Sequence, residues 1–312
     1  MNTIVAQTCC SGGVPLAANL GLPPVNAKTM QFRLSYDLNL LENLKTGRES
    51  LDDNSRSRRT HSVLFELGYS LTKRFSIDGM FTWVRQEREI NQFGNRDLTA
   101  TNGTGDAVFL LKYKAIASEK TGASLTTGIG LKAPVGPSAL KRSDGLTIVA
   151  DLQPGSGAWD LIFWNQYAQA LAARPSMGYS LLATYAVKGT NDEYLGSEEY
   201  SFGNELQLAA SLGDRIFLGK MIFDPSLEIR YRHAQNDQQN GETVPSTGGD
   251  WLFVTPAMSY WFNPDFSVSS SISIPVFADI VGTQLTPSWR FNFSIFHRLS
   301  FYKNQDKTNL FQ

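Results

Sequence analysis

Polar and apolar residues alternate one by one over long stretches of this sequence, and few folds accommodate that pattern. Near the C-terminus, the odd-numbered positions of 289–301 are apolar apart from His297, whereas the even-numbered positions of 288–300 are mostly polar. Successive side chains of a β-strand point to opposite faces, so a period of two predicts strands with one apolar and one polar face. The same alternation opens the fold at residues 30–40.

We predict about twelve such strands, an even number as in bacterial single-chain barrels. Clear alternation recurs at 63–71, 227–231 and 266–276, and weaker candidates fill the gaps at 75–85, 106–115, 123–134, 159–171, 179–187, 202–212 and 252–262. Many reach about ten residues, the length that a tilted strand needs to cross the hydrocarbon core, whereas soluble strands average about five or six.

The predicted connections alternate between short and long. Short turns fall at 72–74, 117–121, 172–176, 213–215 and 263–265, and long polar loops fall at 42–60, 87–105, 136–155, 188–200, 235–250 and 278–284. In outer-membrane barrels the tight turns face the periplasm and the long loops face outside. We therefore expect a periplasmic tail or plug at residues 1–29, a transmembrane barrel at 30–303 and a C-terminal tail at 304–312.

A soluble β-sandwich or lipocalin-like barrel would also alternate, with its apolar face turned inward. Strand length, the short and long connections, and a polar face rich in Ser, Gly, Gln, Arg and Glu favour an all-β, antiparallel barrel in a bacterial outer membrane. Lipid offers backbone amides no partners, and a closed barrel is the sheet without unpaired edges. No apolar run approaches the roughly 18 residues of a membrane-spanning helix.

Charge and cysteine content exclude further classes. A net charge of -1 provides no concentrated positive surface for nucleic acid. The two cysteines are the neighbours Cys9 and Cys10, which cannot form a disulfide framework. Residues 1–7 are too short for a complete export signal, although residues 4–7 resemble the end of one. We therefore expect an export signal that is missing or truncated, through an altered N-terminus or a start codon placed too late.

Three short stretches in the middle of the chain carry a resemblance to a known family. They are GTGD at 103–106, LKAPVG at 131–136 and LQPGSGAWD at 152–160, within a block of about a fifth of the chain. The chain there resembles a family of outer-membrane transporters of the MetA pathway of phenol degradation. The resemblance implies a porin-like β-barrel that passes small, often hydrophobic molecules, and it brings no catalytic residues.

For a pore, the relevant chemistry is that of the side chains that line the lumen. The charged residues on the predicted polar faces are Arg33, Asp37, Glu66, Asp78, Lys112, Lys114, Lys132, Asp160, Glu205, Glu228, Arg230, Arg232, Arg290 and Arg298. In a narrow barrel such charges pair across the interior and fill it, whereas wider barrels leave space for water or ligand. About twelve strands is intermediate, so ion pairing and solute selection both remain open.

The N-terminal segment offers one candidate metal site. Adjacent thiolates such as Cys9 and Cys10 are plausible ligands for a soft metal such as Cu(I). Residues 1–29 could also reach into the lumen as a plug that gates the pore. A mobile tail without metal is the alternative.

The sequence thus predicts a channel or transporter for passive passage of small, in part hydrophobic solutes, with no cofactor, no enzymatic activity and no nucleic-acid partner; membrane lipid and solutes are the expected partners. A non-conducting receptor, adhesion or structural barrel acting through its outer loops is the alternative. The third candidate is an outer-membrane hydrolase. Its candidate bases are His61, His233 and His297, but His61 and Ser62 point to opposite faces of one strand.

Overall fold

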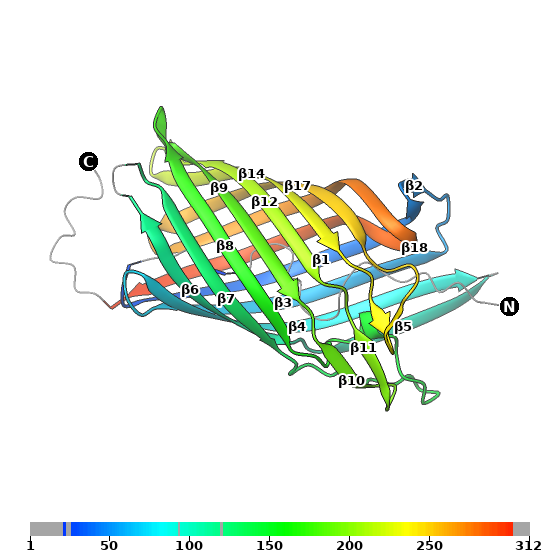
Figure 1. Cartoon of the computed structure of the whole chain (residues 1–312). Coiled ribbons are helices and arrows are strands. Elements are labelled where there is room, and N and C mark those ends of the chain that lie inside the picture. The colour runs from blue at the N-terminus through cyan, green and yellow to red at the C-terminus, as the bar shows by residue number, and fades with distance from the viewer. Residues whose placement is uncertain (1–20, 23–25, 93, 119–120, 302–312) are drawn as a thin grey trace.

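The computed structural model describes residues 21–22, 26–92, 94–118 and 121–301. Its main feature is a closed ring of antiparallel strands in which each strand pairs with its neighbours in chain order (Figure 1). The strands of the ring are β1 (Thr29–Gly47), β3 (Arg56–Ser70), β4 (Phe75–Gln92), β6 (Ala107–Ala117), β7 (Ser124–Ala133), β8 (Asp160–Leu171), β9 (Arg174–Val187), β12 (Glu205–Asp214), β14 (Met221–Ala234), β17 (Gly249–Asn263) and β18 (Phe266–Ser300). The structure is therefore an all-β antiparallel barrel, as predicted, and its ring contains eleven strands where about twelve were predicted.

The ring closes between the first strand and the last. Thr29 lies opposite Ser300, and the pairing continues to Leu40 opposite Trp289. On its other side β1 pairs with β3. Each strand in the ring therefore has two bonded neighbours, as a sheet in lipid requires.

Strand β18 turns back on itself. Its first part pairs with β17 from Phe266 to Ile280, and its last part pairs with β1 as far as Ser300. Gly282 has φ +69, which glycine adopts without strain. The hydroxyls of Ser269 and Ser294 lie 2.6 Å apart, so the two halves of β18 lie side by side.

The two ends of the barrel differ. At one, the short-turn end, brief connections join β3 to β4, β8 to β9 and β17 to β18, and β13 (Ile216–Leu218) extends the hairpin between β12 and β14. The other, the long-loop end, carries β2 (Glu49–Ser50), β5 (Asn95–Thr104), the helix η1 (Ala150–Leu152), β10 (Thr190–Tyr194), β11 (Glu198–Ser201), β15 (Gln238–Gln239) and β16 (Glu242–Thr243). β10, β11, β15 and β16 form a small second sheet beside this mouth (Figure 1).

Several predicted loops are partly strand. β1 runs on to Gly47 and β3 begins at Arg56, inside the loop predicted at 42–60. The loop predicted at 87–105 is a hairpin of β4 and β5, in which Arg96 and Glu89 form an ion pair of 2.6 Å. The turn predicted at 213–215 lies further along, after β13. Backbone pairing continues in these regions without an apolar face, so alternation alone could not show it. No helix in the described ranges is long and apolar enough to span a membrane.

Candidate functional site: the barrel lumen

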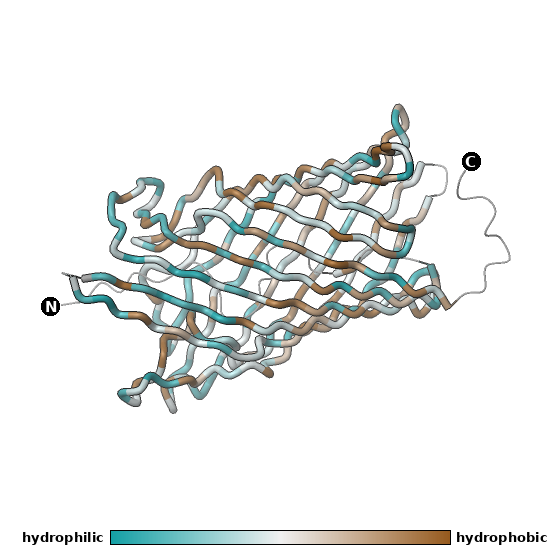
Figure 2. The backbone as a smooth tube through the Cα atoms, turned by 180° about the vertical axis from the view of Figure 1, so that it is seen from behind, coloured by the Kyte–Doolittle hydropathy of each residue, from teal (hydrophilic) through white to brown (hydrophobic). Residues whose placement is uncertain are grey.

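The wall of the barrel has an apolar outer face and a largely polar inner face. On β3, Val63 and Phe65 are exposed, whereas Ser62 and Glu66, on either side of this pair, and Leu64 between them are buried. The same division recurs on β8, where Phe163 is exposed and Asp160 is buried. Figure 2 shows hydrophobic and hydrophilic residues alternating along the strands. The apolar side chains therefore cover the outside of the ring, as predicted.

Ten of the fourteen predicted lining residues pair with one another across neighbouring strands. The pairs are Arg33 with Glu66 at 3.0 Å, Asp37 with Arg290 at 2.7 Å, Asp78 with Lys112 at 2.5 Å, Lys132 with Asp160 at 3.2 Å, and Glu205 with Arg232 at 3.0 Å. Removing a charge from water is costly unless an opposite charge compensates it. Pairing therefore explains how so many ionised groups lie buried on the inner face.

The other four predicted lining residues lie in two places. Glu228 and Arg230, on β14, face a cavity in the lumen. Lys114 is half-buried near the end of β6. Arg298 donates to Asp265 and to the carbonyl of Pro264 at the short-turn end. These last two lie toward strand ends rather than among the five pairs.

Two charged residues that complete the lumen escaped the sequence prediction. Asp106 is fully buried and lies 2.9 Å from Lys132, while Lys188 lies 3.2 Å from Asp160. Asp106 immediately precedes β6 and Lys188 immediately follows β9, where the alternation that assigned the other residues stops. The GTGD stretch at 103–106 and the strand predicted at 106–115 both include Asp106, but neither identified it as a lining residue.

Residues 134–159, between β7 and β8, fold against the inner wall at the long-loop end. Asp151 lies 3.1 Å from Arg58 of β3, whose side chain is almost fully buried. The Thr101 hydroxyl of β5 donates to the carbonyl of Leu152 at 2.6 Å, and the Ser156 hydroxyl donates to Asp106 at 2.7 Å. This segment, here called the inner loop, covers part of the mouth. Arg58, which lies in the polar loop predicted at 42–60, thus anchors the inner loop.

The inner loop also packs on the small second sheet. Ala150 belongs to a buried cluster with Tyr194, Tyr200, Phe202 and Val244. There the Tyr200 hydroxyl donates to Asp237 at 2.7 Å, and burial raises the pKa of both groups. The outer mouth is therefore built from segments that pack on one another.

Inside the barrel, Leu22 is fully buried against the wall. Its N–H donates to Asp78 Oδ2 at 2.8 Å, and its carbonyl accepts a hydrogen bond from Lys112 Nζ. A Cβ at Gly68 would lie 2.8 Å from Leu22 Cδ1, so this glycine leaves the space that Leu22 occupies. Part of the predicted segment 1–29 thus lies within the lumen. Cys9 and Cys10, the predicted metal ligands, lie outside the described residues.

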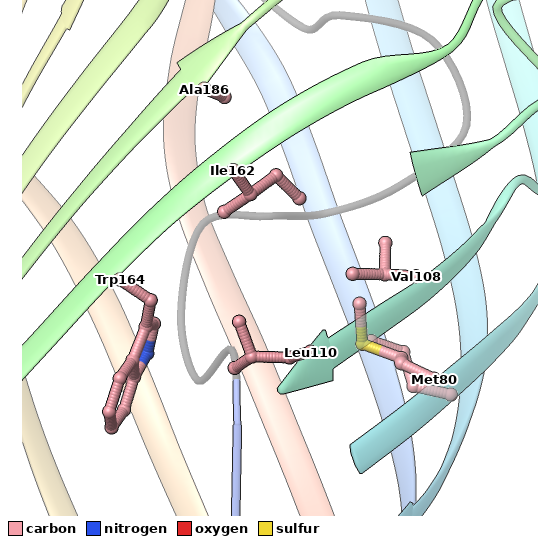
Figure 3. Packing of buried hydrophobic residues seen from close by; sticks show 7 residues of the cluster. Met80, Val108, Leu110, Ile162, Trp164 and Ala186 are labelled. Atoms are coloured by element: carbon pink, nitrogen blue, oxygen red, sulfur yellow. The ribbon is translucent and has the colours of Figure 1, made fainter. Parts of the chain in front are cut away.

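An apolar cluster lies on the same side of the lumen. It comprises Leu64, Met80, Val108, Leu110, Ile162, Trp164 and Ala186, which come from β3, β4, β6, β8 and β9 (Figure 3). A Cβ at Gly21 would lie 3.3 Å from Leu110 and 3.5 Å from Trp164. The inner face therefore offers apolar as well as ionic surface.

Two of the three candidate histidines have a hydrogen-bonding partner in the structure. His61 bonds the Tyr36 hydroxyl at 2.8 Å, and His233 lies 2.8 Å from Asp250. The described residues contain no group of three metal-binding side chains. Trp251 is fully buried, with the Arg232 guanidinium 4.7 Å from the centre of its ring.

No known family description matches the sequence, and no curated protein matches it. Among solved structures, the fold is similar to an outer membrane channel from Pseudomonas putida F1, with 15% identity over 88% of this chain and 97% of that chain and a TM-score of 0.67. It is also similar to the β domain of a Bordetella autotransporter, with 10% identity over 87% and 100% of the chains and a TM-score of 0.51. The transport unit of the autotransporter AIDA-I from Escherichia coli gives 10% identity, 92% and 94% coverage and a TM-score of 0.52.

At these identities the likeness shows the fold alone. The chain folds as a porin-like β-barrel of the outer-membrane type, as the sequence resemblance implied. The MetA-pathway name stays a prediction.

Proposed function

We propose that the protein is a bacterial outer-membrane channel that lets small solutes diffuse through its lumen. The observation that carries the proposal is the division of the wall into an apolar outer face and a polar inner face with a cavity of about 180 Å³. The similar barrel from Pseudomonas putida F1 is described as an outer membrane channel, which supports passage rather than catalysis. In outer-membrane barrels the long loops face outside and the short turns face the periplasm. The proposed channel therefore has its long-loop end outside and its short-turn end in the periplasm.

We infer that β18 crosses the membrane twice. Its halves pair with different neighbours and meet at Ser269 and Ser294. Counting them separately gives twelve crossings, an even number that leaves both ends of the barrel-forming chain in the periplasm.

The N-terminal segment acts, in this proposal, as a plug that gates the lumen. Leu22 occupies space between Asp78, Lys112 and Gly68 that a solute would otherwise fill. Because the neighbouring Gly21 lies close to Leu110 and Trp164 of the apolar cluster, displacement of this segment exposes apolar surface. Solutes with an apolar part are therefore included in the proposal.

Liposome swelling tests the channel directly. Vesicles with the purified protein are exposed to sugars, amino acids and aromatic acids, with protein-free vesicles as the control. We expect swelling that slows as solute size increases, and faster swelling when residues 1–22 are removed. Exclusion of every solute, with and without that segment, would contradict the channel.

A non-conducting receptor or structural barrel is the second candidate. The five ion pairs of the lumen and the inner loop favour it, since both fill space that a pore needs. A hydrolase is the third candidate, and among the described residues His233 and Asp250 form a close pair of acid and base. Lipase and protease assays on the purified protein address that candidate.

A further inference from the structure

Arg230 of β14 has hydrogen-bonding capacity that the wall of the barrel does not use. Its side chain is only 3% exposed, and its Nε and Nη1 have no hydrogen-bond partner. Its Nη2 donates to Ser273 Oγ at 3.3 Å, and its guanidinium lies 5.1 Å from the centre of the Phe253 ring. Buried N–H groups without an acceptor are costly, and more so when they are charged. Arg230 therefore calls for an acceptor from within the lumen.

The cavity that Arg230 lines is large enough for a small organic molecule. Its volume is about 180 Å³, and serine and threonine hydroxyls make up much of its wall. One water needs roughly 10–15 Å³ by this measure. The other charged side chains that line the cavity are Glu228, Asp37 and Arg290.

Of these charges, one pair is already satisfied. Arg290 Nε lies 2.8 and 2.7 Å from the two carboxylate oxygens of Asp37. Glu228 has only a long bond of 3.3 Å from the Ser211 hydroxyl. It stands two residues before Arg230 on the same face of β14, yet no ion pair within 4.0 Å joins these two described side chains. One cation and one anion thus face the same cavity with unused capacity.

We propose that this cavity binds a small zwitterion, whose carboxylate accepts hydrogen bonds from Arg230 while its ammonium donates to Glu228. A simple anion leaves Glu228 without a partner, a simple cation leaves Arg230 without one, and a neutral molecule leaves both. Residues two apart on a strand are separated by about 7 Å, so a chain of several carbons between the two charges suits the site. That the zwitterion is a transported solute rests on the proposed channel function. Binding of the zwitterion in the cavity does not require that it pass through the barrel.

Four molecules of equal chain length test the proposal by calorimetric titration of the intact protein in detergent at neutral pH. They are 4-aminobutanoate, butanoate, butylamine and butanol. We expect 4-aminobutanoate to bind at least tenfold more tightly than the other three. Arg230→Gln removes its advantage over butylamine, and Glu228→Gln removes its advantage over butanoate. Arg96→Gln, on the exposed hairpin of β4 and β5, leaves all four affinities unchanged.

The two charged positions also give independent checks. Circular dichroism establishes that each variant folds. If Arg230→Gln does not fold, Arg230→Lys, which keeps the charge, replaces it. We expect Arg230→Lys to retain the preference for the zwitterion over butylamine. Equal or undetectable affinities for the four molecules, or affinities that neither variant changes, overturn the proposed site. Swelling of liposomes with the same molecules separates the two proposals, because binding without swelling contradicts the channel and leaves the site intact.

Discussion

Asp78 Oδ2 on β4 lies 2.5 Å from Lys112 Nζ on β6, and the two groups together hold the backbone of Leu22. One buried ion pair thus serves both the wall and the segment that enters the lumen. Breaking it should affect the stability of the barrel and the width of its pore.

Asp78→Asn tests this double role. Loss of one partner of a buried pair leaves Lys112 uncompensated, so we expect the free energy of unfolding to fall by about 3–5 kcal/mol. Conductance in planar bilayers should rise, because the hydrogen bond from the Leu22 N–H to a carboxylate is replaced by a weaker one to an amide oxygen. Asp265→Asn, whose partner Arg298 lies at the short-turn end, is the control and should cost less than about 1 kcal/mol. Reduced stability with unchanged conductance would show that the pair supports only the wall.

Gly68→Val displaces Leu22 without changing any charge. A Cβ at position 68 would lie 2.8 Å from Leu22 Cδ1 and 2.9 Å from Asp78 Oδ1. We expect higher conductance than in the unmodified protein. Gly79→Val is the matched control, because the atoms nearest to a Cβ there belong to Phe81 and Phe109, at 3.6 Å or more. If both variants conduct equally, Leu22 does not restrict the lumen.

Lys132 is the common cation of Asp106 and Asp160, at 2.9 and 3.2 Å. Lys132→Met leaves Asp106 buried without its cation, and we expect a loss of about 3–5 kcal/mol in urea unfolding followed by tryptophan fluorescence. Arg142→Met, which removes the exposed pair with Asp97, should cost less than about 1 kcal/mol. A similar loss in both variants would refute the importance of the buried pairs.

The buried cluster of Ala150, Tyr194, Tyr200, Phe202 and Val244, beside Asp237 at the long-loop end, should become less stable as pH rises. Burial raises the pKa of Asp237, so the folded cluster holds that proton more tightly than the unfolded segment does. The resulting stabilisation is present below the ordinary carboxyl pKa of about 3.9 and is lost as pH rises through the raised value. Proteolysis within 235–248, relative to an unfolded substrate, should therefore be faster near neutral pH than in mild acid. Asp237→Asn should remove this dependence, whereas Asp192→Asn, at an exposed position, should retain it.

The faces of the strands could be predicted because alternation is a local property. Glu66 and Phe65 differ in burial because consecutive residues of β3 point to opposite faces of the wall. The partners could not be predicted, because register is a property of two strands. Arg290 lies 253 residues from Asp37, and only closure of the ring brings β18 beside β1.

Strand ends and the particular residues that fill the lumen also escaped prediction. β1 continues to Gly47 where polar residues had indicated a loop, since pairing outside lipid needs no apolar face. Arg58 falls in the polar loop predicted at 42–60, yet it lies in β3 and anchors Asp151 of the inner loop. Leu22 precedes every alternating stretch, so no periodicity could place it in the lumen.

The orientation of the wall is tested most directly at two consecutive residues of β14. Ser226 lines the cavity and Leu227 is 47% exposed on the outer face. Ser226→Cys and Leu227→Cys, each in a protein with Cys9 and Cys10 replaced by serine, are labelled with a small fluorophore and reconstituted in vesicles. Lipids brominated on their acyl chains should quench the label at 227 and leave the label at 226 bright. Stronger quenching at 226, or equal quenching at both positions, would contradict an apolar outer face in lipid around a polar lumen.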